Sequence, residues 1–258
     1  MRIRATVAAV SGALALSALA VPAAHADDVY GDTKISNVVV NGGKALVFGP
    51  ATKKTFTVTF TASDNSGIKT ALAVLWHGPT FNKLDNGSSP KEGSAATCTK
   101  VNTTTVKCKE TFTIDARVQL PNAHAGTWKV WAIAQGKDNN FVQKDNVKSF
   151  KVQRASQLTV NASPEPVKKG GTLTVTGKLS RANWDTGKYA GYGAQPVKLQ
   201  FRKQGAGAYT TLKTIKTGST GNLKTTVKAS GSGYYRYVFA GTSTTPAVNS
   251  AADYVAIK

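Results

Sequence analysis

The feature that most constrains the fold is a two-residue alternation of apolar and polar side chains, which recurs along the chain after its first 26 residues. The clearest example runs from Thr55 to Ala62, where phenylalanine and valine alternate with threonine. Successive side chains of a β-strand point to opposite faces of the sheet, so this pattern is typical of a strand with one buried face. Helix-type periodicity is nearly absent, and the sequence therefore predicts an all-β protein.

Turn sequences such as Asn41-Gly42-Gly43 and Asp64-Asn65-Ser66-Gly67 separate these segments. Many short strands at this spacing are typical of antiparallel β-sandwiches. The predicted strands of the first half are Ile35–Val40, Ala45–Phe48, Thr55–Ala62, Ala71–Trp76, Val106–Ile114, Thr127–Ala134 and Lys148–Val152. Those of the second half are Leu158–Asn161, Leu173–Leu179, Val197–Arg202, Tyr209–Ile215, Leu223–Val227, Tyr234–Phe239 and Tyr254–Ile257.

The chain of 258 residues divides into three predicted parts. Arg2 and Arg4 precede an apolar run and Ala24-His25-Ala26 resembles a cleavage site, so residues 1–26 are predicted to be a removed signal peptide. The run is shorter than the roughly 20 residues that span a bilayer. We therefore expect a secreted, extracellular protein with no membrane anchor, either released or held non-covalently at the cell envelope. A linker near Gln153–Ser156 separates sandwich domains 27–153 and 154–258, each long enough to bury a core.

The two cysteines, Cys98 and Cys108, flank a symmetric segment with Asn102 to Thr104 at its centre. A hairpin that turns there would place the cysteines opposite each other. Outside the cell a disulfide is the default state of an even cysteine pair. We predict a Cys98–Cys108 bond, which would stabilise the fold by roughly 2–3 kcal/mol on the chain-entropy model.

The segment from Val160 to Gly177, followed by Val197–Phe201 and Tyr234–Gly241, resembles the repeated Ig-like domains of exported Gram-positive bacterial proteins. The first half, with Thr61–Ile68 and Gly126–Ala132, is similar to the bacterial Ig and cadherin-like group. The resemblance implies two tandem Ig-like antiparallel β-sandwiches and says little about activity. Some relatives of this type carry a calcium-binding label.

Catalytic motifs are missing from the sequence, and we assign no catalytic residue. After the predicted signal peptide only His77 and His124 could serve as a nucleophile's base, and there is no Gly-x-Ser-x-Gly elbow. Both histidines fit structural or merely exposed positions. The glutamates Glu92, Glu110 and Glu165 fall in unrelated segments, so they predict no glycosidase pair. We expect a protein that is not an enzyme.

Calcium is the one cofactor that the sequence raises. Asp64 and Asp138 lie in two turns that a sandwich could place at the same end, and asparagines accompany them. Calcium takes six to eight oxygens, usually several from carboxylates, whereas only these two carboxylates are evident. Asp and Asn also hydrogen-bond their own turns, so ordinary turn chemistry explains the same residues. We expect weak or absent calcium binding, with Asp64 and Asp138 as the ligands if it occurs.

Charge is distributed unevenly between the halves of the chain. Residues 27–153 carry 16 basic and 10 acidic residues, a net charge of +6, while residues 154–258 carry 15 and 3, a net charge of +12. Alternation turns five of the second domain's cations outward, and neighbouring strands would join them into a basic stripe. The alternative is a solvated face that keeps sheet edges from pairing. The candidate polymer-binding cations are Lys198, Arg202, Lys224, Lys228 and Arg236.

Aromatic residues add a second candidate element to this surface. The glycine-rich insert Ser180–Gly193 contains Trp184, Tyr189 and Tyr192, which could form a platform for sugars, although a Trp here can instead seal the end of the sandwich. The partner suggested is an anionic cell-wall or extracellular polymer or glycan. Nucleic acid ranks below it, because the protein is predicted to be exported and carries no RNP-type motif. The alternatives are a calcium-stabilised structural or adhesive module and an accessory carbohydrate-binding protein.

Overall fold

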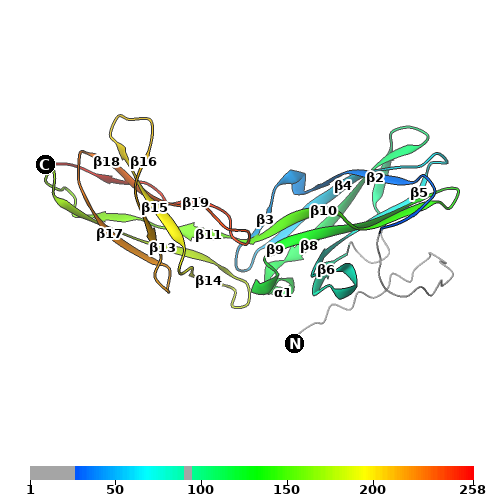
Figure 1. Ribbon diagram of the computed structural model, residues 1–258, viewed down its shortest axis with the longest axis horizontal. Coiled ribbons are helices and arrows are strands. Elements are labelled where there is room, and N and C mark those ends of the chain that lie inside the picture. Colours follow the sequence, from blue (N-terminus) through cyan, green and yellow to red (C-terminus); the bar gives the residue numbers. More distant parts are fainter. Residues whose placement is uncertain (1–26, 90–94) are drawn as a thin grey trace. The chain divides into compact units, whose positions relative to one another are not determined.

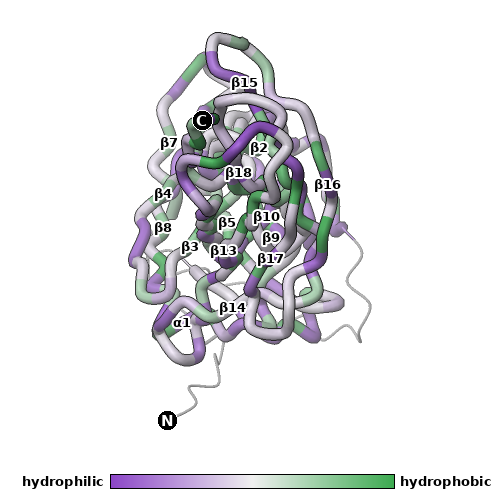
Figure 2. The backbone as a smooth tube through the Cα atoms, turned by 90° about the vertical axis from the view of Figure 1, so that its left-hand side faces the viewer, coloured by the Kyte–Doolittle hydropathy of each residue, from purple (hydrophilic) through white to green (hydrophobic). Residues whose placement is uncertain are grey.

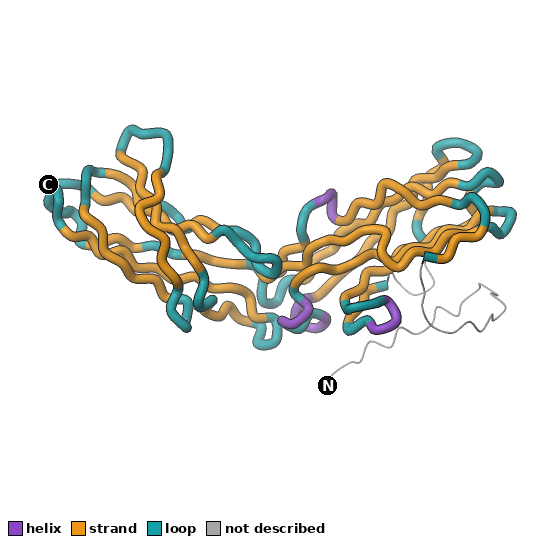
Figure 3. The backbone as a smooth tube through the Cα atoms, in the orientation of Figure 1, coloured by secondary structure: helices purple, strands orange, loops and turns teal. Residues whose placement is uncertain are grey.

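A computed structural model of the protein describes residues 27–89 and 95–258, and nearly all of its regular structure is β-strand (Figure 3). The predicted signal peptide and Glu92 lie outside the described residues. The chain forms two compact units. Of the described residues, unit 1 contains 27–46, 53–114 and 126–152, and unit 2 contains Val47–Thr52, Asp115–Ala125 and Gln153–Lys258. No helix in the described ranges is both long and apolar enough to cross a membrane.

Unit 1 is a sandwich of two antiparallel sheets, and most of its strands are labelled in Figure 1. The first sheet has the order β1 (Asp28–Tyr30), β10 (Phe141–Arg154), β9 (Gly126–Gly136), β5 (Ile68–His77) and β6 (Asn86–Ser88), and β3 (Leu46–Phe48) also pairs with β10. The second has the order β2 (Lys34–Val40), β4 (Lys53–Ser63), β8 (Thr105–Asp115) and β7 (Thr97–Lys100). Short helical turns are η1 (Asn41–Gly43) and η2 (Phe81–Lys83).

Alternation along β4 builds the core of unit 1, as the sequence predicts. Phe56, Val58 and Phe60 are all buried, whereas the intervening threonines are partly or fully exposed. The Phe56 ring stacks on Phe112 of β8, with the ring centres 5.9 Å apart. The hydropathy colours of Figure 2 likewise change from residue to residue along the strands rather than forming long hydrophobic runs. The hydrophobic effect acting on one face of each sheet therefore closes the sandwich.

The hairpin of β7 and β8 carries the predicted disulfide. Cys98 and Cys108 are directly opposite each other in the ladder and are bonded. The turn between them is fixed by Asn102, whose side-chain oxygen accepts a hydrogen bond from the backbone N–H of Thr104. The predicted pairing and the predicted turn are both confirmed.

Unit 2 is also a sandwich of antiparallel sheets. Strand β13 (Thr172–Asn183) lies at the centre of one layer and pairs with β11 (Ser156–Leu158), β12 (Asn161–Ser163), β14 (Lys188–Gly191) and β17 (Asn222–Lys228). The other layer has the order β16 (Thr210–Lys216), β15 (Pro196–Lys203), β18 (Gly233–Phe239) and β19 (Val248–Asn249), with β20 (Asp253–Val255) also on β18. The segments α1 (Ala116–Gln119) and η3 (Asn122–His124) belong to this unit.

One hydrogen bond links the two layers through the core of unit 2. Tyr237 of β18 is completely buried, and its hydroxyl donates to the backbone oxygen of Val175 on β13 at 3.0 Å. Burial also raises the pKa of the Tyr237 hydroxyl. A buried phenol needs such a partner, so this bond fixes where β18 lies against β13.

Two predicted segments differ from the structure. The predicted strand Leu158–Asn161 is interrupted, because Thr159 bonds Lys178 through its backbone N–H and its side-chain oxygen instead of continuing a ladder. The predicted glycine-rich insert Ser180–Gly193 is largely a hairpin, because β13 continues to Asn183 and β14 pairs back onto it. The all-β class and the two antiparallel sandwiches are as predicted.

A buried acid in unit 1 makes its stability depend on pH. Glu110 of β8 is 4% exposed. Its Oε1 accepts a hydrogen bond from the backbone N–H of Ala73 on β5 at 2.8 Å, and its Oε2 has no partner within the described part of the chain. Burial raises the pKa of this carboxyl to about 7, against the opposing effect of the Ala73 bond.

We predict that Glu110→Gln removes most of this pH dependence. A raised pKa in the folded state favours the protonated form, so the stabilisation is complete below pH 4.5 and is lost as the pH rises through about 7. The full change in the free energy of unfolding is on the order of 3 kcal/mol. Urea unfolding at pH 5 and pH 8 should show a smaller difference in the variant than in the wild type. Equal differences in both proteins would show that Glu110 titrates normally.

Candidate anion-binding surface

The outer face of the sheet formed by β16, β15 and β18 carries three of the predicted cations. Val197, Leu199 and Phe201 of β15 are buried, so alternation turns Lys198 and Arg202 outward. On β18, the buried Tyr235 and Tyr237 turn Arg236 outward in the same way. In the ladder Gln200 pairs with Arg236 and Arg202 pairs with Tyr234, which makes the two arginines diagonal neighbours.

Tyrosines and hydrogen bonds hold both arginines in place. The Arg236 guanidinium lies 3.7 Å from the centre of the Tyr209 ring, and its Nε donates to Gln200 Oε1 at 3.0 Å. The Arg202 guanidinium lies 4.4 Å from the Tyr234 ring and 5.3 Å from Tyr209. Its Nη1 donates to the backbone oxygen of Ala206 at 2.9 Å. Each cation–π contact contributes roughly 0.5–1 kcal/mol at an exposed site, so these contacts and the hydrogen bonds together favour one arrangement of the two cations before any ligand arrives.

We call Arg202, Tyr209, Tyr234 and Arg236 the arginine–tyrosine face. Neither arginine forms an ion pair with a carboxylate of the described residues. The acids of residues 154–258 are engaged elsewhere. Asp253 accepts a hydrogen bond from the backbone N–H of Ala162 and Asp185 accepts one from that of Asn122. The pKa of Glu165 is raised by burial and then by its neighbour Asp253.

Two of the predicted cations do not join this face. Lys224 and Lys228 lie on β17, which pairs with β13 in the other layer of unit 2. Lys228 donates to the Thr172 hydroxyl at 2.9 Å, and Lys224 lines a shallow groove of about 520 Å³ with Thr176 and Asn222. The predicted stripe of five cations is therefore divided between two sheets, because β17 does not neighbour β15 or β18.

The aromatic residues of the predicted insert do not form a common platform. Trp184 is 1% exposed, and its indole N–H donates to the backbone oxygen of Phe48, so it seals the unit and is unavailable to a ligand. Tyr192 is half-buried, with Arg181 stacked 3.8 Å from its ring centre. Tyr189 is exposed on β14. The sequence analysis did not identify Tyr209 or Tyr234 as part of this surface. Tyr234 could have been identified, because it alternates with the buried Tyr235 and is therefore expected to face outward.

Unit 1 brings three carboxylates together at its turns. Asp64 and Asp138 lie close to each other as the sandwich arrangement suggests, and Asp32, which the sequence analysis missed, joins them. One oxygen of each carboxylate lies within 4.8 Å of the others. Gly136 makes room for this group, because a methyl group there would collide with the Asp64 carboxyl.

Protein donors already engage these carboxylates. Asp64 is 3% exposed and accepts hydrogen bonds from the Thr33 hydroxyl and from both the hydroxyl and backbone N–H of Ser66. Asp138 accepts bonds from the backbone and side-chain N–H groups of Asn140. Burial raises the pKa of the Asp64 carboxyl, but the bonds from Ser66 and Thr33 outweigh burial and leave the pKa below its ordinary value. Hydrogen-bond donors of the turns therefore satisfy the carboxylates of Asp64 and Asp138.

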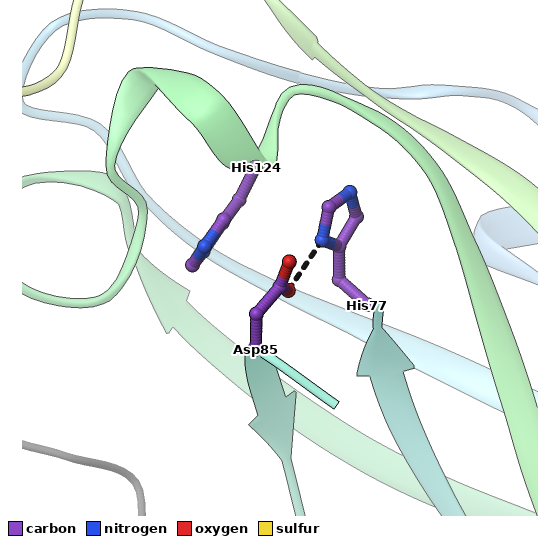
Figure 4. A group of neighbouring side chains, drawn as sticks. All are labelled: His77, Asp85 and His124. Carbon is purple, nitrogen blue, oxygen red and sulfur yellow. Dashed lines mark hydrogen bonds and ion pairs between the residues drawn. The ribbon is translucent and has the colours of Figure 1, made fainter. Parts of the chain in front are cut away.

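A histidine–carboxylate pair ties two strands of unit 1 together. His77 is the last residue of β5, and Asp85 comes just before β6. The Nδ1 atom of His77 lies 2.6 Å from Oδ1 of Asp85 (Figure 4). The His77 ring also lies 5.7 Å from the ring of Trp128. His124, which is drawn in the same figure, belongs to η3 of unit 2. The pair links the end of β5 to the segment that leads into β6.

A family model matches one stretch of the chain, which includes parts of both units and is less than half of the chain's length. Residues 42–134 match a model described as a family of unknown function (DUF5707). No curated protein matches the chain.

Solved structures give loose matches at a TM-score of 0.28. The D00-D0 domain of intimin is 14% identical, with 86% of this chain and 99% of that chain covered. The amphioxus IgVJ-C2 molecule is 9% identical, with 82% and 100% covered. A putative membrane anchored protein from Corynebacterium diphtheriae is 13% identical, with 88% and 59% covered. A score this low transfers neither function nor binding residues to this chain.

We predict that calcium leaves the thermal stability of the protein nearly unchanged, because the carboxylates near Asp64 already accept bonds from protein donors. A ligand stabilises the folded state by mass action, so millimolar calcium should raise the melting temperature by less than about two degrees. The measurement is a thermal melt with calcium and with a chelator. A larger rise that disappears in Asp64→Ala would contradict this prediction and assign the cluster as a calcium site.

Proposed function

We propose that the protein is an exported, non-enzymatic binding protein, which attaches to an anionic polymer of the cell envelope through the arginine–tyrosine face of unit 2. The observation that carries the proposal is the placement of Arg202 and Arg236 around Tyr209 without a neighbouring carboxylate partner in the described residues. Cations held in one geometry and left unpaired at a surface suit a multivalent anion.

Charge and compartment support this proposal. Residues 154–258 carry a net charge of +12, which would attract a polyanion over a distance limited by salt. The cleavage-site pattern at Ala24-His25-Ala26 and the bonded pair Cys98–Cys108 both suit an oxidising exterior. Lys198, on the same outer face, would extend the cationic surface along β15.

Two alternatives remain in different classes. A calcium-stabilised structural or adhesive module is supported by the proximity of Asp32, Asp64 and Asp138. An accessory carbohydrate-binding protein would use neutral sugars as ligands, and the hydroxyl- and amide-lined groove beside Lys224 is the feature that favours it. Salt separates this second alternative from the main proposal, because only a polyanion releases counterions on binding.

We predict that the double variant Arg202→Glu/Arg236→Glu binds an anionic polymer far more weakly than the wild type. The probe is long-chain polyphosphate at about 50 mM salt, and affinity should fall at least about tenfold because two fixed cations are reversed. Wild-type affinity should itself fall steeply between about 50 and 200 mM salt. Both quantities can be measured by fluorescence anisotropy with a labelled polymer.

The matched control is Lys224→Glu/Lys228→Glu, which changes the charge of the same unit equally but on the other sheet. We expect its affinity to fall much less. Equal losses in the two double variants would show diffuse attraction without a site. Absence of binding by the wild type at low salt would overturn the proposed function, and unchanged melting temperatures would show that the variants are folded.

A further inference from the structure

The side chain of Tyr209 contacts two like charges. The guanidinium carbons of Arg236 and Arg202 lie 3.7 Å and 5.3 Å from the centre of its ring. Like charges on neighbouring strands of one sheet face repel each other, and the described residues supply no carboxylate to compensate them. A bound anion would remove this repulsion, so the electrostatic contribution of a ligand is larger here than at an isolated lysine.

The hydrogen bonds of the arginines leave specific donors for that anion. Arg236 uses its Nε on Gln200, and neither of its Nη groups has a partner in the part of the chain that the structure describes. Arg202 uses Nη1 on the Ala206 oxygen, and its Nη2 is likewise without a partner among these residues. A guanidinium is a rigid fork of donors that binds planar or tetrahedral oxyanions through two parallel bonds.

The number of oxygens distinguishes between anions. A carboxylate has two oxygens and one charge, which suit one fork. A phosphoryl group in a monoester has three strong acceptor oxygens and a charge of about −1.5 to −2, so it can accept from both guanidiniums at once. Sheet pairing places the two arginines on one face as diagonal neighbours, about 7–8 Å apart at their backbones, a separation that long side chains can bridge.

We propose that Arg202 and Arg236, positioned by Tyr209, form a phosphate-binding site that recognises phosphoryl groups of the anionic polymer. This inference rests on the proposed function and names the group recognised. Tyr209 is a positioning residue, because its ring orders both guanidiniums without itself pairing with the anion. Tyr234 also contacts the Arg202 guanidinium, at 4.4 Å from its ring centre.

The test compares two polymers of equal length, polyphosphate and poly-glutamate, as ligands of the full chain. The wild type should bind polyphosphate at least about tenfold more tightly than poly-glutamate. Neighbouring phosphoryl groups share a bridging oxygen and so present four acceptor oxygens together to both forks, whereas the carboxylates of poly-glutamate lie on separate side chains. Arg202→Lys/Arg236→Lys keeps the charge but removes the forks. It should still bind both polymers and should lose the preference for polyphosphate.

Tyr209 provides an independent readout. Tyr209→Phe keeps a ring against the guanidiniums and should retain the preference for polyphosphate. Tyr209→Leu should reduce this preference without changing the salt dependence of binding.

A competition experiment identifies the kind of phosphate group that the site recognises. If inorganic phosphate competes with the polymer and a glycerophosphodiester does not, the site recognises terminal phosphomonoesters. If both compete, the site also recognises phosphodiesters along the polymer chain.

Two other outcomes separate the claims. Equal affinity of the wild type for both polymers, together with loss in Arg202→Glu/Arg236→Glu, would overturn the phosphate inference and leave the proposed function standing. Failure of the wild type to bind either polymer at low salt would overturn both.

Discussion

The antiparallel pairing of β15 with β18 is the contact on which the proposed binding surface depends. It places Leu199 opposite Tyr237 on the buried side and Gln200 opposite Arg236 on the exposed side. A shift of one residue would exchange the faces of the moving strand, so the buried aromatic residues that hold the register also hold the arginines outside. The bond from the Tyr237 hydroxyl to Val175 anchors this pair of strands to the opposite layer. The core thereby determines the geometry of the surface.

The charged side chains discussed for the two units differ in whether they have a partner that compensates their charge. In unit 1, the aspartates at the turns have their own hydrogen-bond donors, as the three bonds to Asp64 show. In unit 2, Arg202 and Arg236 have ring and amide partners but no opposite charge among the described residues. Hydrogen-bond donors of the turns therefore satisfy the aspartates of unit 1 without a ligand. The arginines of unit 2 retain an attraction for anions, which is why the proposed function rests on unit 2.

Most strands could be predicted from sequence because alternation is a local signal, as in the run from Phe56 to Phe60. The pairing of strands far apart in sequence has no such signal. Alternation therefore predicted correctly that Lys224 faces outward, but it could not show that β17 pairs with β13 rather than with β15. Trp184 is buried by contact with Phe48, a residue 136 positions earlier. Asp32 reaches the Asp64 cluster from a distant turn, and Tyr209 reaches Arg236 from a different strand pair, so both required the structure.

The most direct test of this account is a residue-resolved map of where an anionic polymer contacts the protein. Amide chemical shifts, followed by NMR as short-chain polyphosphate is added at low salt, provide that map. The account predicts that the largest changes fall on β15, β18 and the start of β16, at and around Arg202, Tyr209 and Arg236, with small changes on β13 and β17. Changes centred on Lys224 and Lys228, or spread evenly over the lysines of both units, would contradict it.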